Sequence, residues 1–161
     1  CAEQYGVLDQ IDFLVGTFGK AIASVGGYII CDSIMRDYLI NKMRPLIFST
    51  ALPPISMAWS DFIFNKVLSM QQQRQHLAEI SQYLQQAVIA KGFSSPSSSH
   101  IIPIILGESQ AAIKKARYVQ QQGFYAMPVR PPTVPQNSSR LRISLTALVQ
   151  KNELQQLVEC L

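Results

Sequence analysis

The hydrophobic pattern of this chain changes its period at a serine-rich segment, SSPSSS, at residues 94–99. Before it, from about Ile55 to Lys91, apolar residues recur at the spacing of one long helix, which Gly92 ends. After it, short apolar runs alternate with helical stretches. We expect the serine segment itself to be a linker or an exposed loop. The change of period predicts a mixed layer of helices and strands in the second half of the chain.

The segment after residue 70 is expected to follow the order α–β–α–β–β–α and to bury a core of its own. Strands are expected at 101–107, 124–129 and 140–145. Pro103 places the first of them near a sheet edge, because proline cannot donate a ladder hydrogen bond. Strict alternation in the last strand sets Leu141 on the core face and Arg142 on the opposite face. Ser109 is expected to cap the helix that Gly123 ends, and a closing helix carries Leu154, Leu157, Val158 and Leu161.

The first part of the chain predicts fewer elements. We expect a buried strand at 11–15, a second strand at 26–31 and a helix at 32–44 that Asp32 or Ser33 caps and Pro45 ends or bends. The overall expectation is an α/β chain with two domains. Residues 1–70 form an incomplete sheet domain, and residues 71–161 form a small α+β domain.

Composition narrows the class of protein. Of the 161 residues 48% are apolar and 15% are charged, which is typical of a globular chain. The sequence has no run of about 18 apolar residues, so a membrane span is not expected. The net charge of +4 is scattered, so nucleic acid is a weak candidate. Three distant cysteines favour neither a metal site nor a disulfide framework, and the default location is the cytoplasm. The chain opens without methionine, and we expect an amino-terminal part to be missing.

One lysine lies in an unusual turn, VGTFGKAIASVGGYII, at residues 15–30. A nucleotide phosphate loop does not fit, because it needs a glycine at Leu14 and a Ser or Thr at Ala21. A partly buried amine at Lys20 would lose its proton more easily and could form a Schiff base with a carbonyl. Thr17 offers a hydroxyl that could hold a phosphate. A plain surface lysine in a glycine-rich turn is the alternative.

The motifs TFGKA…GGYI, RDYLIN…IFSTALPP and VRPPTVP…SRLRISLTA occur in that order along this chain. In this order and spacing the chain resembles the pyridoxal-phosphate (PLP) dependent α-oxoamine synthases, a family of fold-type-I, aminotransferase-like enzymes. The resemblance covers most of the chain, from Asp12 to Leu148. It implies a partial large domain with a complete carboxyl-terminal domain.

The resemblance implies roles for six residues. Lys20 matches the Schiff-base lysine, and its freed amine would act as general base. Thr17 matches a hydrogen-bond donor to the PLP phosphate. Ser49 and Thr50 match a loop that reaches the cofactor of a neighbouring subunit, which implies a homodimer with shared active sites. Thr133 matches a substrate-contacting residue, and Arg142 matches the arginine that pairs with the amino-acid carboxylate. No metal is implied, and Trp59 is expected to pack rather than to contact a cofactor.

By the same resemblance, the enzyme would condense an amino acid with an acyl thioester and release CO₂. The implied substrates are L-alanine and a pimeloyl thioester, on coenzyme A or a carrier protein, in biotin biosynthesis. Ala23 and Ser24 stand where many biotin-branch members have glycine, so glycine C-acetyltransferase and serine palmitoyltransferase types stay open. A further alternative is a non-catalytic fragment that cannot hold PLP alone, because the family's other cofactor contacts precede the lysine.

Overall fold

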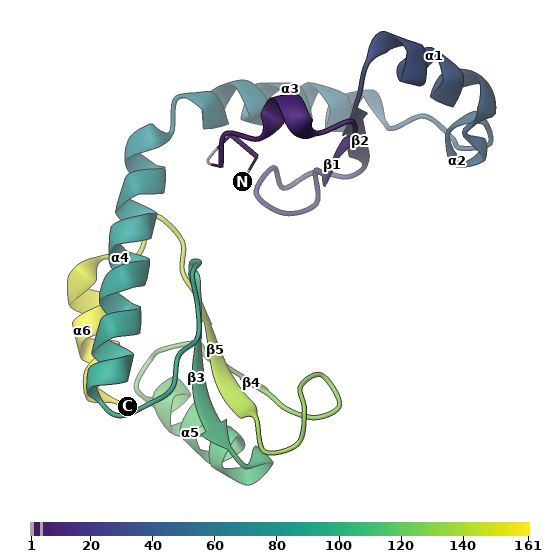
Figure 1. Ribbon diagram of the computed structural model, residues 1–161. Helices are drawn as coiled ribbons and strands as arrows, with labels where there is room; N and C mark the ends of the chain where they lie inside the picture. The colour runs from purple at the N-terminus through teal and green to yellow at the C-terminus, as the bar shows by residue number, and fades with distance from the viewer. Residues whose placement is uncertain (1, 4) are drawn as a thin grey trace. The chain divides into compact units, whose positions relative to one another are not determined.

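The computed structural model describes residues 2–3 and 5–161 (Figure 1). The chain divides into two compact units, Cys1–Ser69 and Met70–Leu161. Among the described residues, no helix combines the length and the apolar character that crossing a membrane requires.

The first unit is built on a two-stranded antiparallel sheet. Strand β1 (Leu14–Thr17) pairs with β2 (Gly27–Ile30), so that Leu14 is opposite Ile30 and Thr17 is opposite Gly27. A short 3-10 turn, η1 (Leu8–Gln10), precedes the sheet. Three helices follow it: α1 (Ser33–Lys42), α2 (Arg44–Ile47) and α3 (Pro54–Leu68).

No described side chain of the first unit is buried. The expected buried strand at 11–15 is therefore wrong in two respects: β1 begins at Leu14, and its residues alternate between half-buried and exposed. All four residues of β2 are exposed. Two strands and three helices leave these faces uncovered, because a lone two-stranded sheet is too small to enclose a core.

The helix ends follow local chemistry. The Asp32 carboxylate accepts a hydrogen bond from the backbone N–H of Met35 at 2.8 Å, which confirms the predicted cap of α1. Pro45 stands in the first turn of α2, where its missing N–H has no helical partner to lose, so it starts a helix rather than only ending one.

The predicted helix from Ile55 to Lys91 is two helices, α3 and α4 (Gln71–Ala90). The prediction was wrong at Ser69, the residue after α3. Its hydroxyl donates to the carbonyl of Lys66 at 2.8 Å, and its backbone N–H donates to the same oxygen at 3.1 Å. Local serine bonds of this kind compete with the helical ladder and favour helix termination.

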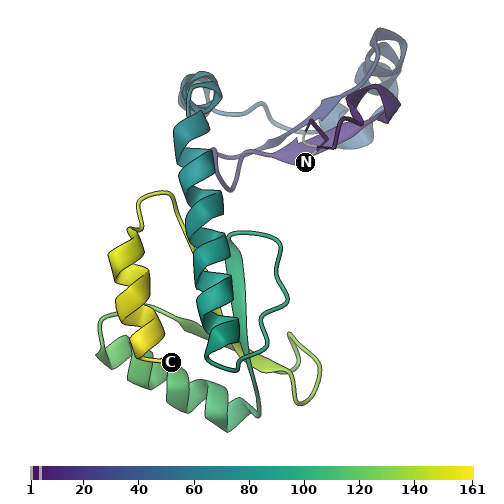
Figure 2. The same cartoon turned by 60° about the vertical axis from the view of Figure 1, so that its left-hand side comes forward.

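The second unit is a three-stranded antiparallel sheet with helices on one face (Figures 1 and 2). The strand order is β3 (Ile101–Gly107), β5 (Ser139–Ser144) and β4 (Met127–Val129). The helices are α4, α5 (Ser109–Gln121) and α6 (Lys151–Glu159). The order of elements confirms the predicted α–β–α–β–β–α, and β3 with Pro103 lies at a sheet edge as predicted.

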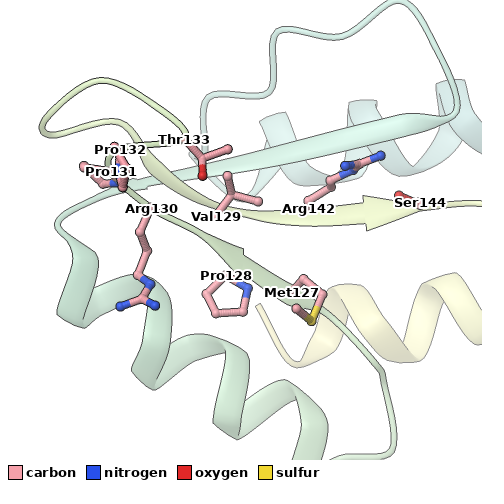
Figure 3. Close-up of a pocket in the computed structure, with 9 residues that line it drawn as sticks. All are labelled: Met127, Pro128, Val129, Arg130, Pro131, Pro132, Thr133, Arg142 and Ser144. Atoms are coloured by element: carbon pink, nitrogen blue, oxygen red, sulfur yellow. The ribbon is translucent and has the colours of Figure 1, made fainter.

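The core lies between that sheet and its helices. Ile102 is paired with Ile143, and Ile104 with Leu141, and these side chains point to the helical face. The helices contribute Ile80, Leu84 and Val88 from α4, Ala116 and Val119 from α5, and Leu154 and Leu157 from α6. Within the described residues, no helix of this unit covers the opposite face of the sheet, and a pocket that Arg142 lines is on that face (Figure 3).

Of two expectations for loops and caps of this unit, one was wrong and one is confirmed. Ser109 does not cap α5: the cap residue is Glu108, and the Ser109 hydroxyl lies 3.2 Å from the Ser139 hydroxyl. The serine segment 94–99 is a loop with Ser94, Pro96, Ser98 and Ser99 exposed, as predicted, and it is anchored to α4. The Gln85 side-chain amide donates to the carbonyls of Ser95 at 2.9 Å and Ser97 at 2.6 Å, and Ser95 is 4% exposed.

Candidate active site

The lysine loop, which we define as residues 18–26, joins β1 to β2. Its ends are closed by two backbone bonds: Phe18 N–H donates to Gly26 at 3.0 Å, and Ser24 N–H donates to Phe18 at 2.8 Å. Gly26 has a φ of 94°, and Ala23 has a φ of 50°, which is unfavourable for a residue with a side chain. The closed loop presents Lys20 to solvent, and Thr17 is exposed at the end of β1.

The expected partial burial of Lys20 is not found within the described residues. Lys20 is exposed, and the strands on both sides of its loop have no covering layer. The amine of Lys20 is therefore accessible from solvent.

Tight glycine contacts fix the base of the loop. A Cβ at Gly16 would lie 2.4 Å from the Tyr28 ring, so Gly16 is needed for that ring to lie across β1. A Cβ at Gly26 would lie 2.7 Å from Leu52 Cδ1. Leu52 belongs to the segment that follows α2, and that segment also carries Ser49 and Thr50. Both are exposed, and the Ser49 hydroxyl donates to the Thr50 carbonyl at 3.3 Å.

A pocket of about 500 Å³ lies on the second unit, on the sheet face without helices (Figure 3). We call it the arginine pocket; it is lined by Met127, Pro128, Val129, Arg130, Pro131, Pro132, Thr133, Arg142 and Ser144. Arg142 is in register between Pro103 of β3 and Met127 of β4, so it stands at the centre of this face. The structure therefore brings together Thr133 and Arg142, which are nine positions apart in sequence.

Sequence reasoning missed one guanidinium of this pocket. Arg130 lines it together with Arg142, and the Arg130 carbonyl accepts the backbone N–H of Thr133 at 3.0 Å. In Figure 3 the two arginine side chains extend in different directions from the pocket wall. The available signal was its position directly before the proline turn that holds Thr133.

The predicted site residues are divided between the units. Lys20, Thr17, Ser49 and Thr50 belong to the first unit, and Thr133 and Arg142 belong to the second. Their chemistry fits a phosphorylated aldehyde cofactor and a carboxylate substrate. A primary amine and a hydroxyl three residues before it in the sequence suit the cofactor, and guanidinium groups suit the carboxylate.

Solved structures define the class of fold. Sphingomonas wittichii serine palmitoyltransferase matches 99% of this chain with a TM-score of 0.90 at 29% identity, and the match covers 41% of that protein. Francisella tularensis 8-amino-7-oxononanoate synthase matches 92% of this chain with a TM-score of 0.80 at 25% identity, covering 44% of that protein. The chain thus has part of the α/β fold of fold-type-I PLP enzymes, as the sequence predicted.

The model of the aminotransferase class I and II family matches residues 2–161, and the chain belongs to that family. Among curated relatives, the 8-amino-7-oxononanoate synthase of Haemophilus ducreyi is 52% identical over 161 residues. That alignment covers 99% of this chain and 42% of the relative. The chain therefore spans less than half the length of this relative.

Proposed function

We propose that the polypeptide carrying this chain is a PLP-dependent C-acyltransferase, an 8-amino-7-oxononanoate synthase. It would condense L-alanine with a pimeloyl thioester, on coenzyme A or a carrier protein, and release CO₂, in biotin biosynthesis in the cytoplasm. The observation that carries the proposal is the 52% identity to the Haemophilus ducreyi synthase along a stretch that includes both the lysine loop and the arginine pocket.

The first unit would hold the cofactor. Lys20 would bind PLP through its exposed amine, and the Thr17 hydroxyl, three residues earlier, would donate to the phosphate. When bound, PLP supplies an electron sink for the negative charge that develops at the substrate α-carbon. The amine of Lys20, once free, would take the proton from that carbon.

The second unit would orient the amino acid. A guanidinium binds a carboxylate through two parallel, charge-assisted hydrogen bonds, and Arg142 is exposed at the centre of the arginine pocket. Thr133 adds a hydroxyl at the rim. Arg130 offers a second positive group in the same pocket, which suits substrates that carry more than one negative group.

The loop with Ser49 and Thr50 would complete the site of a second subunit. Both hydroxyls are exposed, and the loop is fixed through Leu52 at Gly26, so it is held without being covered. We therefore propose a homodimer in which each subunit contributes these two residues to the phosphate of its partner's cofactor.

A specific observation favours each of two alternatives. The 0.90 TM-score with a serine palmitoyltransferase favours a related synthase that uses another amino acid and acyl chain. The absence of any buried side chain among the described residues of the first unit, with Lys20 exposed, favours a chain that cannot hold PLP alone.

A substrate matrix tests the proposal. The complete polypeptide that carries these residues is assayed with L-alanine, glycine or L-serine against pimeloyl, acetyl or palmitoyl thioesters. We expect CO₂ release above background only with L-alanine and the pimeloyl thioester. Turnover with serine and palmitoyl thioester alone would replace the proposal by the first alternative. The 161-residue chain, incubated with PLP and borohydride, should take up no label if the second alternative holds.

A further inference from the structure

We propose that Trp59, Ser60 and Ser24 are positioning residues for Lys20, because they fasten the lysine loop to helix α3. The inference rests on the proposed role of Lys20. It concerns side chains that the sequence assigns to packing or to no role.

Three side-chain bonds join the loop to α3. The Trp59 indole N–H donates to the carbonyl of Ile22 at 3.2 Å. The Ser60 hydroxyl lies 2.8 Å from the Ser24 hydroxyl and 2.8 Å from the carbonyl of Ser56. The Ser24 hydroxyl in turn lies 3.3 Å from that same carbonyl. The three contacts between the loop and α3 connect positions that are more than 30 residues apart in the chain.

The loop atoms that α3 binds belong to Ile22 and Ser24, shortly after Lys20 in the chain. The Lys20 carbonyl accepts the backbone N–H of Ala23 at 2.9 Å, so residues 20–23 form one turn. Trp59 holds the carbonyl inside this turn, at Ile22, and Ser60 holds the residue after it, at Ser24. The turn that begins at Lys20 is therefore fixed to a separate element on its downstream side.

The backbone of the loop needs such support. Ala23 has a φ of 50°, a conformation that a residue with a Cβ adopts only where its surroundings impose it. The hydrogen bonds on either side of Ala23, at Ile22 and at Ser24, supply that constraint. Without them we expect the turn to sample other conformations and the direction of the Lys20 side chain to vary.

In this inference the hydrogen bonds from Trp59 and Ser60, rather than the packing of the Trp59 ring, hold the lysine loop. Trp59 is 44% exposed, and its ring contact is with Phe62 of its own helix, at a centroid distance of 6.1 Å. Trp59→Phe therefore removes the N–H donor and keeps a ring on the helix. Ser60→Ala removes one hydroxyl, and Ser60→Thr restores it.

The test uses the complete polypeptide with Trp59→Phe, Ser60→Ala, the double variant and the rescue variant Ser60→Thr. Asn65→Ala is the matched control, because the Asn65 side-chain amide also donates to a carbonyl of α3, that of Asp61, at 2.9 Å and lies outside the contacts with the loop. The first readout is amide hydrogen exchange of peptides covering 18–26 in the cofactor-free protein. The second is the rate at which PLP becomes attached to Lys20, trapped with borohydride and mapped by mass spectrometry.

We expect the double variant to exchange its loop amides about tenfold faster and to attach PLP several-fold more slowly. The control and Ser60→Thr should match the parent protein in both measurements. We also expect kcat to fall while the KM for the amino acid stays unchanged, because the arginine pocket is untouched.

If the double variant and Asn65→Ala show equal loop exchange and equal attachment rates, the inference is overturned. A merely structural role would accelerate exchange across both units, and that result would overturn it as well. If the parent protein takes up no PLP at Lys20, the proposed function fails, whereas the exchange data from the cofactor-free protein still decide whether the loop is fastened to α3.

Discussion

Truncation of Leu141 to alanine tests whether the core beneath the arginine pocket is packed as described. Leu141 is 0% exposed, lies on the central strand β5 and is opposite Ile104 on one side and Pro128 on the other. Removal of three carbons loses about 2.4 kcal/mol of transfer free energy, at about 0.8 kcal/mol each. A central strand can collapse little, so a cavity term brings the expected loss of unfolding free energy to about 4 kcal/mol.

Urea unfolding of the chain, followed by far-UV circular dichroism, measures this loss. With a slope of about 1 kcal/mol per molar urea, the midpoint of the second unit should fall by about 4 M, or the unit should be unfolded without urea. Leu148→Ala is the matched control, because Leu148 is 86% exposed and should change the free energy by less than about 0.5 kcal/mol. Equal effects of the two substitutions would refute the core packing described for β5.

Three other substitutions probe the site and its supports. Arg142→Ala in the complete polypeptide should raise the KM for the amino acid about 10- to 100-fold, because a charge-assisted pair is lost, and Arg142→Lys should raise it by an intermediate factor. If Arg130→Ala raises this KM and Arg142→Ala does not, the carboxylate binds Arg130 instead. Gln85→Ala should lower the free energy of unfolding by about 1–3 kcal/mol and speed protease cleavage within 94–99, because two hydrogen bonds are lost. An unchanged cleavage rate would contradict the anchoring of this segment by Gln85. Gly26→Ala should lower the melting temperature because of its φ of 94° and its contact with Leu52, and Leu52→Ala in the same protein should recover part of the loss if the contact is real.

The second unit was predictable because its patterns are local. Alternation alone places Leu141 inward and Arg142 outward, and the structure agrees at both positions. A proline in a strand indicates an edge, and Pro103 is on one. In each case the physical cause acts within a few residues, so the local sequence is enough to predict the position of the side chain or strand.

The first unit was less predictable because its burial depends on distant partners. An apolar run such as 11–15 shows which residues would prefer a core, and it does not show whether anything covers them. The break at Ser69 depends on one hydroxyl competing for one carbonyl inside a continuous helical pattern. The anchoring of the lysine loop by Trp59 joins residues 37 positions apart, and no spacing rule connects them.

The position of the PLP-bearing lysine tests the account most directly. The complete polypeptide is incubated with PLP, reduced with borohydride, digested and analysed by mass spectrometry, beside a Lys20→Ala variant. We predict one phosphopyridoxyl group per subunit on the peptide that contains Lys20, and none at that site in the variant. Label on a different lysine, or equal labelling of both proteins, would contradict the role assigned to Lys20.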